Sequence, residues 1–317
     1  MGRASSTWRK KMIRNKPGVI VELSRCVLLS ALVALHSVAY AQKAKQAAKE
    51  GETGDHRLIF AINEGAAGNM TATDILFRYE SFKPVVEKAI GQQIVLLAVR
   101  DAKELRRALS TGAYALVLSR PADTLAEAVR DYGYQAVVSS TEPAHAIFIV
   151  KKDSPLKTIA DIKGKKIVTP DKYAYMWRIA AAMMRDNKIS MADEQVRTMG
   201  DQAAIGWSME SGFFDVGVVA SYSGVGRTWE KNGGRVIARS TELPNTPMIA
   251  SQRVSPAQVQ KLRAALVSLQ SVPNGPSVLK AIGIPGFKEA QSQSLVDLIT
   301  WLGDLETIKQ AGVSQSK

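Results

Sequence analysis

The alternation of apolar and polar positions along the chain predicts an α/β protein. Six-residue apolar runs at 57–62, 94–99 and 114–119 alternate with segments whose apolar residues recur every three or four positions. The runs are typical of buried strands, and the recurring spacing is typical of helices that bury one face. In the helical segment from 74 to 89, Pro84 is expected to kink or restart the helix. Strand and helix units of this kind favour a doubly wound sheet with parallel neighbours.

The pattern continues through the rest of the chain. A second α/β unit is expected at about 150–240, and helices are expected to close the chain. The further strands are expected at 134–140, 145–150, 166–169, 195–199, 215–220, 235–240 and 247–251. The further helices are expected at 102–109, 120–132, 171–184, 202–211, 255–270, 276–282 and 289–302.

The first 41 residues are typical of a secretory signal peptide rather than of the fold. A basic start is followed by an apolar run at 26–35 and by the small-x-small site at 39–41. A membrane anchor is the alternative, but a spanning helix needs about 20 apolar residues and this run has ten. We therefore expect cleavage between Ala41 and Gln42 and export to the periplasm.

Composition then narrows the classes of function. Cleavage would remove the only cysteine, Cys26, and leave 35 Lys and Arg against 28 Asp and Glu. These charges are dispersed without interleaved aromatic residues, which argues against nucleic-acid binding, although a positive field favours an anionic solute. With two histidines left, no metal or cofactor is expected. Residues 42–56 are expected to form a mobile leader, and the true start (Met1 or Met12) stays open.

No catalytic signature is present in the sequence. It has no Gly-x-Ser-x-Gly or His-Glu-x-x-His motif, and no Gly-Lys-Ser/Thr follows the Gly-rich loop at 63–73. Glu64 and Asp215 could form a pair of carboxylates, but nothing in the sequence brings them together. The chain is therefore expected to be a binding protein and not an enzyme.

Ligands of open α/β sheets lie beyond the carboxyl ends of the strands, where helix N-termini attract anions. The loop 63–73 offers donors from Asn63, Thr71 and Thr73, although it also fits an ordinary Gly-rich turn. Arg120 follows the third strand and could bind an oxyanion with its guanidinium group. A solvated arginine at a helix start is the alternative.

The loop after the strand 166–169 carries several aromatic residues. Thr169 is expected to cap the next helix, with Pro170 in its first turn. Tyr173 and Tyr175 could form an aromatic wall for an organic or cationic group. Alternatively, the two tyrosines pack at the surface of their α/β unit.

Three further residues complete the candidate site. Gln202 could donate a hydrogen bond to a ligand, and Asp215 could accept one from an amine or a hydroxyl. Alternatively, Asp201 is simply a helix cap and Asp215 a residue at the end of a strand. Tyr222, in the loop 221–226 after the strand, is expected to line the same site.

Four segments resemble type II periplasmic binding proteins, and most closely the phosphonate-binding component of ABC importers. They are 82–91, 108–118, 153–168 (DSPLKTIADIKGKKIV) and 212–219, within a resemblance that covers roughly 57–300. Two positions depart from the family. Tyr114 stands where an Asp is frequent, and 171–175 lacks the Ser-Thr-Ser-like triplet that holds phosphonate oxygens in relatives, whereas Asp215 fits the family's pattern.

The resemblance implies a two-lobed α/β fold with a helical tail. Lobe 1 would comprise 57–144 and 245–317, and lobe 2 would comprise 145–244. It also implies a monomer whose cleft closes on a small solute by hinge motion and that delivers the solute to an ABC permease. The alternative is a solute-binding sensory or scaffold protein that signals to a membrane receptor.

Overall fold

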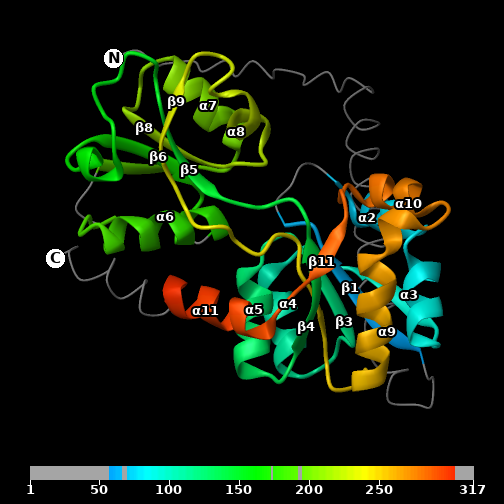
Figure 1. The fold of residues 1–317 in the computed structure, drawn as a ribbon. Helices are drawn as coiled ribbons and strands as arrows, with labels where there is room; N and C mark the ends of the chain where they lie inside the picture. The colour runs from blue at the N-terminus through cyan, green and yellow to red at the C-terminus, as the bar shows by residue number, and fades with distance from the viewer. Residues whose placement is uncertain (1–56, 66–69, 173, 192–194, 304–317) are drawn as a thin grey trace, which may run out of the picture. The chain divides into compact units, whose positions relative to one another are not determined.

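The computed structural model describes residues 57–65, 70–172, 174–191 and 195–303, and these form two β-sheets flanked by helices (Figure 1). The predicted signal peptide, its cleavage site and the leader fall in residues 1–56, outside the described residues. Tyr173, one of the predicted site residues, also lies outside them.

The larger sheet has six strands in the order β11-β4-β10-β3-β1-β2. They are β1 (Leu58–Asn63), β2 (Ile94–Ala98), β3 (Leu116–Ser119), β4 (Gln135–Ser140), β10 (Met248–Ala250) and β11 (Phe287–Glu289). β1 pairs in parallel with β2 and β3, and Asn63 lies opposite Ser119, so the carboxyl ends of β1 and β3 meet at one edge. β10 and β11 return antiparallel to their neighbours.

Seven of the described helices accompany this sheet, and the strands and helices from β1 to α5 alternate in the predicted order. They are α2 (Ala72–Tyr79), α3 (Lys83–Ile90), α4 (Ala102–Ser110), α5 (Asp123–Asp131), α9 (Pro256–Val267), α10 (Gly275–Ile282) and α11 (Ser292–Leu302), with the short 3₁₀ turn η2 (Leu269–Ser271). The predicted restart at Pro84 is confirmed, because a turn separates α2 from α3. In Figure 1, α9 lies beside α3.

The smaller sheet has five strands in the order β7-β6-β8-β5-β9. They are β5 (Ala146–Val150), β6 (Lys166–Pro170), β7 (Gln195–Met199), β8 (Val216–Ala220) and β9 (Arg235–Arg239). Its helices are α6 (Tyr175–Asp186), α7 (Gln202–Glu210), α8 (Gly224–Thr228) and the 3₁₀ turn η1 (Ile159–Ile162). β6 pairs in parallel with β7 and β8, which places the carboxyl ends of all three at one edge.

We call the six-stranded sheet with its helices lobe 1, and the five-stranded sheet with its helices lobe 2. The chain passes from β4 to β5 and returns from β9 to β10, so two segments join the lobes. They are paired through a bridge between Ala144 and Leu243. The residue boundaries predicted for the lobes from the sequence stay a prediction.

The start of α6 differs from its prediction. The helix expected at 171–184 begins at Tyr175 and runs to Asp186. β6 pairs with β7 as far as Pro170, so this residue is still in the strand, and a turn closed by the Ala174 amide on the Asp171 carbonyl follows. The predicted cap at Thr169 is therefore wrong, because its buried hydroxyl donates to the Pro170 carbonyl oxygen, 3.1 Å away.

Two short elements were not predicted. β11 is only three residues long, and α8 lies in what the sequence indicated to be a loop. Among the described helices, none combines the length and the apolar character that crossing a bilayer requires. Within the same residues, no group of three or more His, Cys, Asp or Glu side chains is arranged to hold a metal ion.

Candidate functional site

Asn63 and Arg120 lie at the carboxyl ends of β1 and β3, as predicted, and both are held by local contacts. The Asn63 side chain donates to the Val99 carbonyl oxygen at 2.8 Å and accepts from the Gly65 amide at 2.8 Å. The Arg120 amide donates to the Asn63 carbonyl oxygen at 2.9 Å, so the two loops are joined. Much of the Asn63 amide is therefore used to build the turn.

A buried carboxylate, Glu64, neutralises Arg120. The Glu64 residue is 3% exposed, and its Oε2 atom accepts a charge-assisted hydrogen bond from Arg120 Nε. Its Oε1 atom accepts from the Tyr79 hydroxyl at 2.5 Å. Burial by itself would lower the pKa of Arg120, but the adjacent Glu64 carboxylate raises it above the ordinary value. Arg120 therefore stays charged, and its charge is compensated inside lobe 1.

Lobe 2 contributes two tyrosines at the carboxyl ends of β6 and β8. Tyr175 is the first residue of α6 and is 7% exposed, and Tyr222 follows β8 and is half-buried. Burial raises the pKa of Tyr175 well above its ordinary value, and the nearby Asp123 and Tyr222 raise it further. Burial also raises the pKa of Tyr222, which Arg120 opposes. These influences place Arg120 and Asp123 of lobe 1 near the two tyrosines of lobe 2.

The first turn of α6 contains polar atoms without a partner. Among the described residues, the hydroxyl oxygen of Tyr175 and the Nε atom of Arg178 are buried and make no hydrogen bond. Ala174, the N-cap residue, has no side chain that could cap the helix. Because an unsatisfied buried polar group costs about 1–3 kcal/mol, two such groups in one helical turn require an explanation.

Gln202 also lies at the carboxyl edge of the lobe 2 sheet, where it begins α7. Its side-chain oxygen accepts from the Ala220 amide at 2.7 Å and thereby ties α7 to the end of β8. Asp201 caps α7 by accepting from the Ala203 amide at 2.8 Å. The interpretation of Asp201 as a helix cap is therefore confirmed.

Thr71, Thr73 and Asp215 have local structural contacts of their own. Thr71 is exposed and caps α2, where it forms a capping box with Asp74, and Thr73 is exposed in the first turn of the same helix. Asp215 precedes β8, at the amino end of the strand, and accepts from the Lys166 amide at 2.9 Å. Since β6 and β8 are parallel, Asp215 lies at the sheet edge opposite Tyr222.

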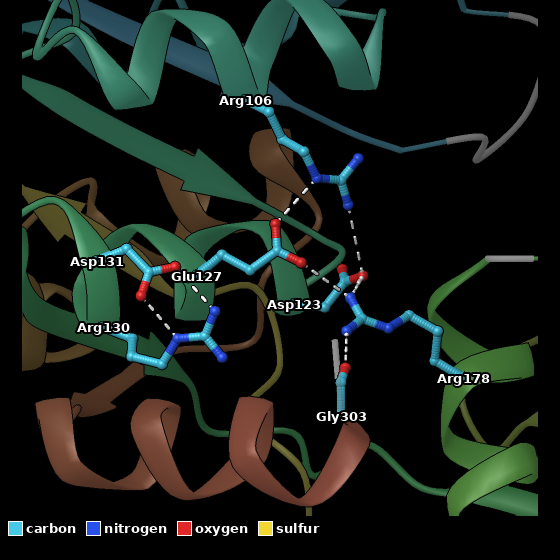
Figure 2. A network of polar contacts seen from close by, with 7 residues as sticks. All are labelled: Arg106, Asp123, Glu127, Arg130, Asp131, Arg178 and Gly303. Carbon is cyan, nitrogen blue, oxygen red and sulfur yellow. Dashed lines mark hydrogen bonds and ion pairs between the residues drawn. The ribbon is translucent and has the colours of Figure 1, made fainter. Parts of the chain in front are cut away.

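A network of charges joins the lobes beside this site (Figure 2). Arg178 of α6 is fully buried, and its Nη1 atom donates to Asp123 Oδ2 at 2.8 Å and to Glu127 Oε1 at 3.1 Å, both on α5. Its Nη2 atom donates to the Gly303 carbonyl oxygen at 2.8 Å, directly after α11. Arg106 of α4 donates to Glu127 Oε2 at 2.9 Å and so shares the carboxylates.

The sequence interpretation did not single out Asp123, Glu127 or Arg178. A signal for them was present, because Arg178 is the one charged residue in the run YMWRIAAAMM of α6. Asp123 and Glu127 are four residues apart, which places them on one face of α5. That Arg178 pairs with these two carboxylates across the lobe boundary is visible only in the tertiary structure.

Comparisons with known proteins show the family and the fold of the chain. Residues 65–295 match the family described as "ABC transporter, phosphonate, periplasmic substrate-binding protein". No sequence among the curated proteins matches the chain.

Similar solved structures include XAC2383 from Xanthomonas citri bound to ATP (14% identity, 81% of this chain and 99% of that chain, TM-score 0.64). PhnD1 from Prochlorococcus marinus in complex with methylphosphonate is similar at 12% identity, over 81% and 99% of the two chains, with TM-score 0.56. The aliphatic sulphonate binding protein SsuA from Escherichia coli is similar at 14% identity, over 81% and 94%, with TM-score 0.54.

These structural likenesses show the fold, which is the two-lobed fold of type II periplasmic binding proteins that the sequence predicted. The family match extends over most of the chain, from loop 63–73 of lobe 1 through lobe 2 to α11. The chain therefore belongs to the family of periplasmic substrate-binding proteins of phosphonate ABC transporters.

Proposed function

We propose that this chain is the extracytoplasmic receptor of an ABC importer and binds a small anionic solute between its lobes. The solute would be of the phosphonate, phosphite or sulfonate kind, and closure of the lobes around it would precede delivery to the permease. The family match supports a solute-binding role. Beyond the family match, we propose the class of ligand, the residues of the site and the closure of the lobes around the ligand. We also propose that the chain acts as a monomer and is not an enzyme.

The observation that carries the proposal is the first turn of α6. Tyr175 and Arg178 each have a buried polar atom that finds no partner among the described residues, and both atoms can donate a hydrogen bond. An oxyanion accepts several hydrogen bonds at once, and the N-terminal end of a helix adds a favourable dipole. A solute oxygen at this turn would satisfy donors that are otherwise costly to bury.

The charges near this turn limit how an anion is recognised. Arg120 is compensated by Glu64, and Arg178 by Asp123 and Glu127. The site therefore has little net positive charge, and recognition would depend on hydrogen-bond donors rather than on long-range attraction. We accordingly expect binding to weaken only slightly as ionic strength rises.

The remaining predicted residues divide by position. Asn63, Gln202 and Tyr222 lie at carboxyl strand ends and remain candidates, as does Tyr173, which precedes α6 by two positions. Thr71 and Thr73 lie farther along their loop, in α2, and their part in binding stays a prediction. Asp215 is left out of the proposed site, since it lies at the opposite edge of the lobe 2 sheet.

A thermal-shift screen tests the proposal with methylphosphonate, phosphite, methanesulfonate, taurine and inorganic phosphate. A solute at a hundred times its Kd should add about 2.7 kcal/mol and raise Tm by roughly 5 °C or more. Tyr222→Phe should reduce this shift, while Asp215→Asn, the matched control, should leave it unchanged. If none of these solutes raises Tm, the anionic ligand class is refuted.

A further inference from the structure

Arg178 belongs to lobe 2, yet among the described residues the ion-pair and hydrogen-bond partners of its side chain lie in lobe 1 or directly after α11. Its guanidinium group is fully buried and bonds to Asp123, Glu127 and the carbonyl oxygen of Gly303, at 2.8–3.1 Å (Figure 2). A buried charge is tolerated only where it is paired. Moving α6 away from α5 would break the ion pairs between Arg178 and the two carboxylates. The buried charge of Arg178 would then be left unpaired.

Apolar packing surrounds the ion pairs on α6. Met176 and Ile179 share one buried cluster with Leu125 of α5 and with Leu298 of α11. At the far end of the helix, Trp301 Nε1 donates to Asp186 Oδ2 at 2.7 Å. The contact of α6 with α11 therefore continues to the far end of the helix, while α5 joins it near the first turn.

An ion pair beside the two crossing segments is more exposed. The Arg227 side chain of α8 is 58% exposed and pairs with Glu142 at 2.7 Å. Exposed pairs of this kind add little to stability. Of these two polar contacts, the buried ion pairs of Arg178 are therefore the stronger.

We infer that Arg178 is a positioning residue that holds the first turn of α6, and with it Tyr175, against lobe 1 whether or not a solute is bound. Motion of the lobes then pivots about the contact of α5, α6 and α11 instead of separating it. The assignment of Tyr175 to the solute rests on the proposed function, whereas the fastening of the lobes does not.

Spin-label distance measurements across this contact test the inference. One label replaces Tyr132, after α5, and the other replaces Asn187, after α6, in the full chain with its single cysteine removed as Cys26→Ser. The background protein should show one narrow distance with and without methylphosphonate. Arg178→Met should add a broad, longer component.

Arg130→Met is the matched control, because Arg130 pairs with Asp131, its neighbour on α5, at 2.7 Å. This variant should keep the narrow distance. In Arg178→Met, if the joined arrangement falls to about a tenth of the population, the affinity for a bound probe such as methylphosphonate should fall at least about tenfold, because the proposed Nε donor is lost as well. Arg178→Lys keeps the charge but not the forked set of donors, so its distance distribution and its affinity should lie between those of Arg178→Met and Arg130→Met.

Two results would overturn the inference. One is an unchanged narrow distance in Arg178→Met, and the other is a broad background distance that narrows only with methylphosphonate. If Arg178→Met does not fold, the combination Asp123→Asn, Glu127→Gln and Arg178→Met leaves no unpaired charge among the three, and a narrow distance in it would also refute the inference. The spin-label distances measured without methylphosphonate test the inference even if no solute in the thermal-shift screen binds. The inference and the proposed function can therefore be refuted independently.

Discussion

The first turns of α5 and α6 invite comparison, because both follow a buried strand and neither has a side-chain cap. On α5, Asp123 is 3% exposed and has two arginines within 4.0 Å. On α6, the hydroxyl of Tyr175 and the Nε atom of Arg178 are equally buried, but among the described residues they bond to nothing. One turn is satisfied by the protein itself, and the other is not.

The difference separates two roles that lie a few residues apart. Full ion pairs around Asp123 fasten the lobes and leave no charge for a solute. The neutral hydroxyl of Tyr175 contributes no bond to stability and is available for recognition. Removing the Tyr175 hydroxyl should therefore lower affinity without lowering stability, whereas substitution of Arg178 should lower both.

Arg178→Met should cause the largest loss of stability. It leaves the buried Asp123 without its nearer partner and removes one of the two arginines that pair with Glu127, and breaking a buried pair from one side costs about 3–5 kcal/mol. Urea unfolding followed by circular dichroism measures the loss. Arg130→Met, which removes a pair on the helix surface, should cost less than about 1 kcal/mol. Equal losses would mean that burial of Arg178 does not matter.

Tyr79→Phe should cause an intermediate loss. The ring still packs with Phe82, but the bond to the Glu64 carboxylate disappears, and a hydrogen bond to a charged group contributes about 1.5–3 kcal/mol. Tyr134 is the control, because its buried hydroxyl donates to the Tyr114 carbonyl oxygen at 2.8 Å. Tyr134→Phe should therefore lose only about 0.5–1.5 kcal/mol in the same urea titration. The reverse order would show that Glu64 is not held through Tyr79.

The fold was predictable from the sequence because many of its strands are short apolar runs, and β3, β5 and β8 are buried throughout. Misplaced elements share a physical reason. The start of α6 depends on how far β6 pairs with β7, and β11 is a strand only because β4 offers it an edge. Pairing between distant segments leaves no periodic signal in the segment itself.

The site was predictable only in part. Tyr175, Arg120 and Tyr222 were selected because they follow strands, and parallel pairing does bring strand ends together. Asp215 was selected by its likeness to the family, but it precedes its strand and lies at the other edge. The partners of Arg178 could not be predicted, since they depend on how the two lobes pack.

Tyr175→Phe should cause no loss of stability and a clear loss of affinity. The buried hydroxyl makes no bond among the described residues, so its removal should not lower the free energy of unfolding at pH 7, and relief of its burial cost should raise it by up to about 1–3 kcal/mol. The affinity for a solute found in the thermal-shift screen should nevertheless fall about tenfold, as expected for one lost hydrogen bond of roughly 1.4 kcal/mol. Isothermal titration calorimetry measures it, with Tyr134→Phe as the control that loses stability but not affinity.

The stability of Tyr175→Phe and of the wild type should also differ in its response to alkaline pH. Burial, with Asp123 nearby, raises the pKa of Tyr175, so the folded protein keeps a proton that the unfolded chain loses above about pH 10. The stability linked to this proton is complete below pH 10 and declines as the pH rises further. Between pH 9 and 11, Tyr175→Phe should therefore lose about 1 kcal/mol less than the wild type. Equal losses would show that water reaches the hydroxyl in the folded protein, and the contrast between α5 and α6 would then reduce to their ion pairs.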